Sequence, residues 1–348
     1  FLPLHMSNLY SSDPGLVRRL EGNNHPVNCC ALSSDGRIAL SVSNDNAILW
    51  DTSDGVPVHT LKGHTNAVEG CALSADAKLA LTGSVDKTCI LWNTSNGTQI
   101  RTLKGHTNEL CGCALSADGK LALSASFDCT CILWNTLDGT PIHILKGHTR
   151  TVWDCALSAN GELALSASDD TTCILWNTSN GKLIRTLKGH TKSVDGCDLS
   201  ADGRLAISAS FDKTCIIWNT SEGTPIFTLK QHNRIVRACA LSVDGRLALT
   251  GSWDNTCILW NTFDGTPVRV FKGHTLGINR CALSANGRLA LSASHDHTCI
   301  LWDTSSSDVE HMSMSFKALT RDMGSRLSML HHEIVQALFG YNFFELLH

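Results

Sequence analysis

Seven tryptophans recur along the chain at an interval of 42 residues, and this period constrains the fold more than any other feature of the sequence. The seven positions are Trp50, Trp92, Trp134, Trp176, Trp218, Trp260 and Trp302. Seven units of 42 residues account for 294 of the 348 residues. A unit of this length cannot bury an apolar face by itself, so successive units must pack against one another.

Each unit contains four short apolar runs separated by turn residues, which predicts four strands per unit. In the second unit the expected strands are 68–74, 78–84, 88–94 and 98–103. Ala-Asp-Gly at 117–119 and Ser-Asn-Gly at 95–97 are typical of the tight turns that join paired strands, because Asn and Gly tolerate positive φ. The sequence therefore predicts an all-β repeat protein.

The composition is that of a folded protein without an excess of positive charge. Hydrophobic residues make up 43% and charged residues 17% of the chain, which excludes disorder over most of its length. A net charge of −4 argues against nucleic acid as a partner. No window approaches about 18 uninterrupted apolar residues, so no membrane partner is expected, and the first 15 residues show no targeting pattern. Because the chain begins with Phe1, we interpret it as a piece of a longer protein.

Most of the 16 cysteines belong to the repeat. Two recurring places hold Cys30, Cys71, Cys113, Cys155, Cys197, Cys239 and Cys281, and Cys89, Cys131, Cys173, Cys215, Cys257 and Cys299. Cysteines at equivalent positions of stacked units pack as small buried apolar residues, and free thiols favour a cytoplasmic location. Cys111 and Cys129 each lie two residues before another cysteine, but no second pair follows at a zinc-like interval. We therefore expect no metal site and no cofactor.

The chain resembles the WD40 family from about Leu16 to Thr304. The resemblance rests on Trp-Asp or Trp-Asn at the end of the third strand and on Gly-His at 63–64, 105–106, 147–148, 189–190 and 273–274, with Gln-His at 231–232. It implies an all-β, seven-bladed propeller of four-stranded antiparallel blades, closed by pairing the N-terminal strand with the last blade. Residues 16–20 hold the place of an outer strand that no segment supplies after Trp302.

The expected organisation has three parts. Residues 1–15 form an N-terminal tail and 16–304 form the propeller. Residues 305–348 form a C-terminal tail that loses the repeat and is partly helical, with apolar spacing that predicts a helix from about 324 to 338.

A histidine, a serine, an aspartate and the tryptophan recur at fixed spacing in six units, and these residue types invite comparison with a hydrolase triad. The six sets are His64, Ser84, Asp86, Trp92; His106, Ser126, Asp128, Trp134; His148, Ser168, Asp170, Trp176; His190, Ser210, Asp212, Trp218; His232, Ser252, Asp254, Trp260; and His274, Ser294, Asp296, Trp302. An active site normally occurs once, and geometry rather than residue type defines a triad. In WD40 proteins the corresponding residues form a buried hydrogen-bond network, so the resemblance implies a structural role.

The first unit departs from this pattern. Gly22-Asn23 stands where Gly-His is expected, and Ser43, Asp45 and Trp50 remain. Terminal repeats are often atypical, so we expect this blade to be the least stable.

Three positions of the unit vary, although most others are almost the same in every unit. The residue before the aspartate is Asn44, Val85, Phe127, Asp169, Phe211, Trp253 and His295 in turn. After Gly-His, the first variable position is Pro26, Ala67, Glu109, Thr151, Ser193, Ile235 and Gly277, and the second is Asn28, Glu69, Cys111, Trp153, Asp195, Arg237 and Asn279. The resemblance implies that these positions share the top face around the central channel, where partners of WD40 proteins commonly bind.

The residue types at these positions favour recognition over drift. Aromatic residues and an arginine on one face are typical of an interaction hot spot, and acidic residues would surround them. Drift in exposed loops is the alternative, and it should favour small polar residues rather than Phe and Trp.

We therefore expect a non-catalytic, monomeric module that binds a protein or peptide on its top face. The fifteen residues expected to bind the partner are Asn44, Glu69, Val85, Glu109, Cys111, Phe127, Trp153, Asp169, Asp195, Phe211, Ile235, Arg237, Trp253, Asn279 and His295. Near-identical units with diversified top-face residues resemble the WD40 sensor regions of NACHT or NB-ARC NTPases of the STAND type. The chain has no Gly-x-x-x-x-Gly-Lys-Ser/Thr loop, so a nucleotide switch would lie in another part of such a protein. A free-standing intracellular scaffold or adaptor is equally consistent with the residues. An enzyme with a single site in the channel is a further alternative, for which we find no unrepeated acid, base and nucleophile.

Overall fold

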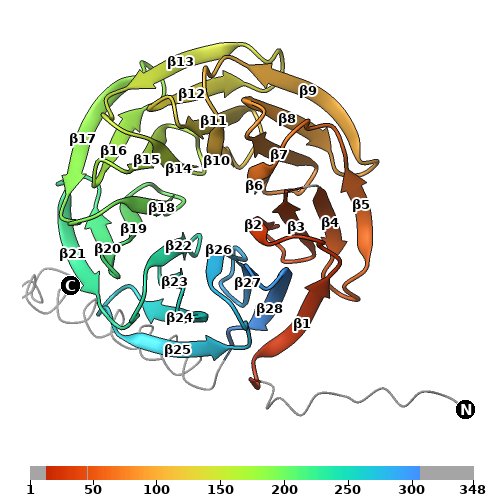
Figure 1. Ribbon diagram of the computed structural model, residues 1–348. Helices are drawn as coiled ribbons and strands as arrows, with labels where there is room; N and C mark the ends of the chain where they lie inside the picture. Colours follow the sequence, from red (N-terminus) through yellow and green to blue (C-terminus); the bar gives the residue numbers. More distant parts are fainter. Residues whose placement is uncertain (1–12, 45, 306–348) are drawn as a thin grey trace, which may run out of the picture. The chain divides into compact units, whose positions relative to one another are not determined.

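The computed structural model describes residues 13–44 and 46–305, and all regular structure within them is β-strand. Seven four-stranded antiparallel sheets surround a central channel as the blades of a propeller (Figure 1). The predicted all-β, seven-bladed fold is confirmed. The helix expected near 324–338 and residues 1–12 of the expected N-terminal tail lie outside the described residues.

The blades are numbered along the chain, and the first strand of each blade lines the channel. From the channel outward the strands are β2 (Val27–Leu32), β3 (Ile38–Ser43), β4 (Ala47–Asp51), β5 (Pro57–Leu61); β6 (Val68–Leu73), β7 (Leu79–Ser84), β8 (Thr88–Asn93), β9 (Thr98–Lys104); β10 (Leu110–Leu115), β11 (Leu121–Ser126), β12 (Thr130–Asn135), β13 (Pro141–Lys146); β14 (Val152–Leu157), β15 (Leu163–Ser168), β16 (Thr172–Asn177), β17 (Lys182–Lys188); β18 (Val194–Leu199), β19 (Leu205–Ser210), β20 (Cys215–Asn219), β21 (Thr224–Leu229); β22 (Val236–Leu241), β23 (Leu247–Ser252), β24 (Thr256–Asn261), β25 (Pro267–Lys272); and β26 (Ile278–Leu283), β27 (Leu289–Ser294), β28 (Thr298–Asp303), β1 (Leu16–Glu21). In the second blade every strand boundary lies within one residue of the predicted one.

The ring closes through the chain's first strand. β1 pairs antiparallel with β28, so the seventh blade takes its outer strand from the N-terminal side (Figure 1). Leu20 of β1 is fully buried, and the Arg19 guanidinium donates to the Gly273 carbonyl oxygen at 2.8 Å. Because the seventh blade packs against the first, every blade has a neighbour on both sides. Closure therefore leaves no open end through which an unclosed array of blades would aggregate.

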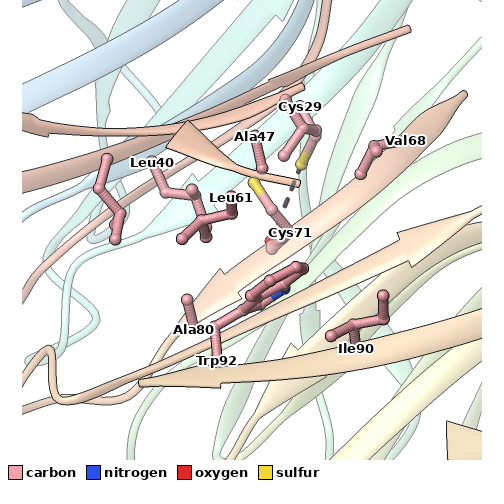
Figure 2. Packing of buried hydrophobic residues seen from close by; sticks show 11 residues of the cluster. Cys29, Leu40, Ala47, Leu61, Val68, Cys71, Ala80, Ile90 and Trp92 are labelled. Carbon is pink, nitrogen blue, oxygen red and sulfur yellow. Dashed lines mark hydrogen bonds between the residues drawn. The ribbon is translucent and has the colours of Figure 1, made fainter. Parts of the chain in front are cut away.

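The core lies between neighbouring blades. Between the first and second blades, Leu40 and Leu61 on one side meet Val68, Cys71 and Trp92 on the other (Figure 2). The second and third strands are almost wholly buried, which explains their continuous runs of apolar residues. The outer strands keep much of one side exposed.

Two cysteines lie in each of the seven clusters between blades, which accounts for most of the cysteine content. Six clusters pair the third strand of one blade with the first strand of the next, as Cys131 and Cys155 do. The first blade has Ala47 at the third-strand position, and there Cys29 joins Cys71 instead (Figure 2). All described cysteines are free, and burial raises the pKa of Cys155 well above its usual range, so this thiol packs as a neutral apolar group.

One turn departs from the repeat and is strained. Between β6 and β7, Ala77 adopts a left-handed conformation with φ of 56°, where the other six units have glycine. A Cβ atom is disfavoured in this conformation. At the equivalent Gly119, a Cβ would lie 2.7 Å from the Leu79 Cδ1 atom.

We expect Ala77→Gly to raise the free energy of unfolding by about 1 kcal/mol, because glycine adopts this conformation without steric strain. Urea unfolding of the two proteins measures the difference. Ala75→Gly is the matched control, since Ala75 lies in the same turn without a positive φ, and it should not stabilise the protein. Equal stabilisation by both substitutions would contradict the interpretation.

Candidate functional site

A bulge at the start of each inner strand directs one side chain per blade to the mouth of the channel. In β6, Val68 lies opposite Ser84 and Gly70 opposite Gly83, so Glu69 has no opposite residue. The other six inner strands show the same shift in register. An extra residue of this kind bends the strand and redirects its own side chain. The seven bulged residues are those of the second variable position after Gly-His.

The remaining variable positions lie on two loops that are joined by their backbones. The amide of Val85, in the hairpin between β7 and β8, donates to the carbonyl oxygen of Ala67 at 3.0 Å. The five following blades repeat this bond, as between Phe127 and Glu109. We call these two loops of each blade, with the bulged residue, the top face.

A cavity of about 240 Å³ opens at the centre of the top face. Its lining residues are Asn28, Glu69, Val85, Glu109, Cys111, Phe127, Trp153, Asp195, Arg237, Asn279, Arg280 and His295. All seven bulged residues are among them. Ten of the fifteen residues that the sequence assigned to partner binding thus meet in one cavity.

The other five do not line this cavity. Phe211 and Trp253 stack beside it, with ring centroids 6.3 Å apart, and Trp253 also contacts His295 at 5.9 Å. Ile235 contributes its carbonyl oxygen to the Trp253 amide. The other two are Asp169, which forms an exposed ion pair with Arg150, and Asn44, whose amide oxygen accepts a bond from Asn28.

Aromatic side chains form two groups around the mouth. Phe127 and Trp153 meet edge to face at 5.1 Å, and the Arg237 guanidinium lies over the Trp253 ring at 5.7 Å. The indole nitrogens of Trp153 and Trp253 are buried and find no acceptor within the described residues. Four aromatic residues that the sequence placed on one face are therefore gathered there, in two clusters.

Two ion pairs hold the arginines of the channel. The Arg237 Nε atom lies 3.0 Å from a carboxylate oxygen of Asp195, which is 3% exposed. Arg280 reaches from the seventh blade to the fourth, where its Nη2 atom lies 3.0 Å from Asp154 Oδ1. Arg280 also donates to the Asp195 carbonyl oxygen at 3.2 Å. It lines both the top cavity and a second cavity below it, so this cross-channel pair lies between the two.

The pair formed by Arg280 and Asp154 was not predicted, although the two residues occupy a position that varies among the units. The residue after the bulge is Cys29, Gly70, Gly112, Asp154, Gly196, Ala238 and Arg280 in the seven units, so this position also varies. The glycines leave room for the ion pair, because a Cβ at Gly112 would lie 2.8 Å from Asp154 Oδ1. A Cβ at Gly196 would lie 2.7 Å from the Arg237 carbonyl oxygen.

Burial shifts several pKa values in the cavity. It raises the pKa of Glu69, a shift that Arg237 opposes and Glu109 reinforces. Burial and the Arg237 charge lower the pKa of His295, which keeps its imidazole neutral at pH 7. Burial raises the pKa of Cys111 well above its usual range, so this residue lines the cavity as a thiol.

The lower cavity contains one carboxylate that breaks the repeat. Asp198 occupies a position where the other six units have alanine. Its oxygens accept bonds from the amides of Leu199 and Leu241, each at 2.8 Å. Burial nevertheless raises the pKa of Asp198 to about 7, and the nearby Asp154 adds to the shift.

The repeated polar residues form a buried chain of hydrogen bonds in six blades. In the third blade, the Trp134 indole N–H donates to Ser124 Oγ at 2.9 Å, and Ser124 Oγ lies 2.8 Å from His106 Nε2. The His106 Nδ1 atom lies 2.8 Å from Asp128 Oδ2, which also accepts from the Thr107 amide. Burial would raise the pKa of Asp128, but bonds from Thr130 and His106 hold it below its usual value. The chain ties the loop, the hairpin and two strands together.

In six blades the serine singled out from the sequence bonds to the network aspartate, but it is not the residue that joins the tryptophan to the histidine. The linking hydroxyl belongs to the residue two positions earlier, and the six linking residues are Thr82, Ser124, Ser166, Ser208, Thr250 and Ser292. The six serines expected there were Ser84, Ser126, Ser168, Ser210, Ser252 and Ser294, which instead accept from the amide of the network aspartate. Residues two apart share one face of a strand, so spacing alone did not distinguish them.

The Ser-His-Asp contacts resemble a triad in connectivity but offer no access to a substrate. Ser124 is completely buried, and its oxygen already accepts the Trp134 N–H. The same arrangement occurs in six blades. In the first blade, Asn23 replaces the histidine and accepts a bond from Ser41, while Asp45 lies outside the described residues. These contacts support the structural role over the catalytic one.

The described residues contain neither a cluster of metal-ligating side chains nor a membrane-spanning helix. Among residues 13–44 and 46–305, no three His, Cys, Asp or Glu side chains converge as metal ligands would. No helix in the described part of the chain is long and apolar enough to cross a membrane.

Comparison with family models matches the chain seven times to one description, "WD domain, G-beta repeat". The matched residues are 15–51, 55–93, 97–135, 139–177, 181–219, 223–261 and 265–303. A comparison with curated proteins finds no match.

We expect Ser124→Ala to lower the free energy of unfolding by about 1–3 kcal/mol, because it leaves the buried Trp134 and His106 nitrogens without their partner. Chemical denaturation measures the change. Ser126→Ala is the comparison, since it leaves the chain from Trp134 to Asp128 intact and should cost less. A larger loss of unfolding free energy in Ser126→Ala than in Ser124→Ala would contradict the assignment of Ser124 as the linking residue.

We expect Asp198→Ala to stabilise the protein relative to the native chain increasingly as the pH rises from 5 to 8. The raised pKa means that the fold favours neutral Asp198, so its contribution is complete below the unfolded pKa of about 4 and is lost as the pH rises through about 7. The stability difference should change by at most about 1.4 kcal/mol per pH unit in this window. Urea unfolding at both pH values tests this, and a pH-independent difference would contradict it.

Proposed function

Because the chain belongs to the WD40 repeat family, whose propellers generally serve as protein-interaction modules, we propose that its top face binds a protein or peptide. One observation supports this proposal above the others: the positions at which the seven units differ converge on the cavity of the top face. The repeated residues build the blades, whereas the diverged residues line the mouth. Sequence divergence therefore coincides with a surface that the fold itself does not require.

The chemistry of the mouth fits recognition of a polypeptide. Trp153 and Trp253 offer large, rigid apolar surfaces, which are the usual anchors of a protein interface. The indole N–H of each is buried and has no acceptor within the described residues. Arg237, Glu69 and Glu109 supply charges for specificity.

We propose a non-catalytic, monomeric propeller that uses neither nucleic acid, membrane nor cofactor. The free cysteines of the described residues support a cytoplasmic location. The network hydroxyls are buried and shared with tryptophan, so they do not favour the alternative of an enzyme in the channel.

Two biological settings fit this module. The near-identity of the units resembles the sensor region of a STAND-type NTPase, and a free-standing scaffold or adaptor needs no further domain. Sequencing the gene upstream of the Phe1 codon distinguishes them, because a nucleotide-binding domain there selects the sensor and its absence selects the adaptor.

Peptides selected from a random phage library on the purified chain test the binding face. We expect Trp153→Ala and Trp253→Ala each to weaken binding of a selected peptide by about tenfold or more, because each removes an aromatic anchor. Fluorescence anisotropy with the labelled peptide measures the dissociation constant.

Phe263→Ala provides the control for this experiment. Phe263 is an aromatic residue that is 69% exposed, outside the top face, and its replacement should leave binding unchanged. Binding that survives both tryptophan substitutions but is lost in this control would move the interface away from the top face.

A further inference from the structure

We infer that the top-face cavity binds a positively charged side chain of its partner, an arginine or a lysine, beside Glu69 and Glu109. This inference deepens the proposed function and rests on it, since it names the chemical class that the same cavity selects. Three features of the described residues support it: carboxylates without a counter-ion, an aromatic pair beside them, and a buried donor that lacks an acceptor.

Both arginines of the cavity already have partners. Arg237 is paired with Asp195 and Arg280 with Asp154, each at 3.0 Å. Asp154 accepts a further bond from the Cys197 amide. Each guanidinium charge therefore has a carboxylate counter-ion within the described residues.

Glu69 and Glu109, in contrast, form no ion pair within the described residues. The only side-chain contact that Glu69 makes there is a bond accepted from the Asn28 amide at 3.2 Å. Neutral His295 adds no positive charge. The lining and its ion-pair partners therefore contain four carboxylates and two guanidinium groups, which leaves an excess of two negative charges.

The excess negative charge lies on one side of the ring. Glu69 belongs to β6 and Glu109 directly precedes β10, in the second and third blades. Arg237 belongs to β22, on the opposite side of the channel (Figure 1), whereas the Arg280 guanidinium reaches from β26 across the channel to Asp154 in the fourth blade. Both guanidinium charges act on Glu69, but each is paired with an aspartate, so a cation beside Glu69 and Glu109 is attracted by the two carboxylates that remain unpaired.

The aromatic pair lies next to this acidic side. Phe127 follows β11 in the third blade, and Trp153 belongs to β14 in the fourth. Their rings meet at 71°, and the negatively polarised face of either ring, rather than its edge, can attract a cation. The buried Trp153 indole N–H has no acceptor within the described residues.

The size of the cavity indicates one side chain rather than a folded element. Its volume of about 240 Å³ corresponds to about eight water molecules at about 30 Å³ each. A single extended arginine or lysine can enter by displacing these waters. An acidic side chain is the competing ligand, but the charge of Arg237 is already balanced by Asp195, which is 97% buried.

The test is a double-mutant cycle between the cavity and a peptide selected on the native chain. Glu69→Gln/Glu109→Gln keeps the shape of both side chains and removes both charges. In the peptide, the arginine is replaced by citrulline, or the lysine by norleucine. We expect selected peptides to share one arginine or lysine. Each change alone should raise the dissociation constant by about tenfold, and the two together should raise it little further.

Glu162→Gln/Glu222→Gln is the matched control. It removes the same two charges from exposed residues that do not line the cavity, and it should change the dissociation constant by less than about twofold. An equal loss in the control would mean that overall charge, rather than contact in the cavity, attracts the peptide. Thermal unfolding establishes that the cavity variant is folded, and the peptide substitution tests the inference independently of it.

The two proposals fail in different ways. Selected peptides that share an aspartate or glutamate, lose affinity in Arg237→Gln and bind Glu69→Gln/Glu109→Gln normally would overturn the cationic ligand while keeping the top face as the interface. Peptides whose binding is unaffected by Trp153→Ala and Trp253→Ala would overturn the proposed function itself.

Discussion

Packing of blade against blade is the interaction on which the rest of the structure depends. No single sheet can bury its two apolar faces, so each blade is stable only between two others, and the ring must close. The pairing of β1 with β28 completes that closure with the first strand of the chain. Two cysteines at each interface fill the space between sheets as small buried side chains, including the interface at which Ala47 occupies the usual cysteine position and Cys29 supplies the second cysteine.

The repeated scaffold leaves the mouth of the channel free to vary. The hydrogen-bond chain from Trp134 through Ser124 and His106 to Asp128 fixes a loop and a hairpin in the blade, and its equivalents do so elsewhere. The loops are therefore held by residues that do not face a partner. The bulge in each inner strand adds one more side chain at the mouth, independent of the core.

The channel is where the seven-fold repetition is broken most strongly. Arg280 and Asp154 meet across it, and Asp198 stands alone among alanines below them. Asp154 and Asp198 each accept a bond from a backbone amide of the next blade, and each occurs in one blade alone. Together with Glu69 and Glu109, these charged residues give the channel an asymmetric charge distribution within an otherwise repetitive molecule. Such asymmetry is the condition for selecting one ligand orientation.

The closure of the ring by the first strand was implied by the resemblance to the WD40 family and is confirmed by the pairing of β1 with β28. The sequence by itself determined the number of repeated units, the four strands of each and the positions that vary. These follow from local patterns, since a 42-residue period, turn residues and apolar runs are properties of consecutive residues. Only the tertiary structure decided that Ser124 rather than Ser126 joins the network, and that Arg280 pairs with Asp154. The two serines share one strand face and differ only in their distance from the loop. Arg280 and Asp154 lie 126 residues apart in the chain, and the closed ring brings them together from opposite sides of one channel.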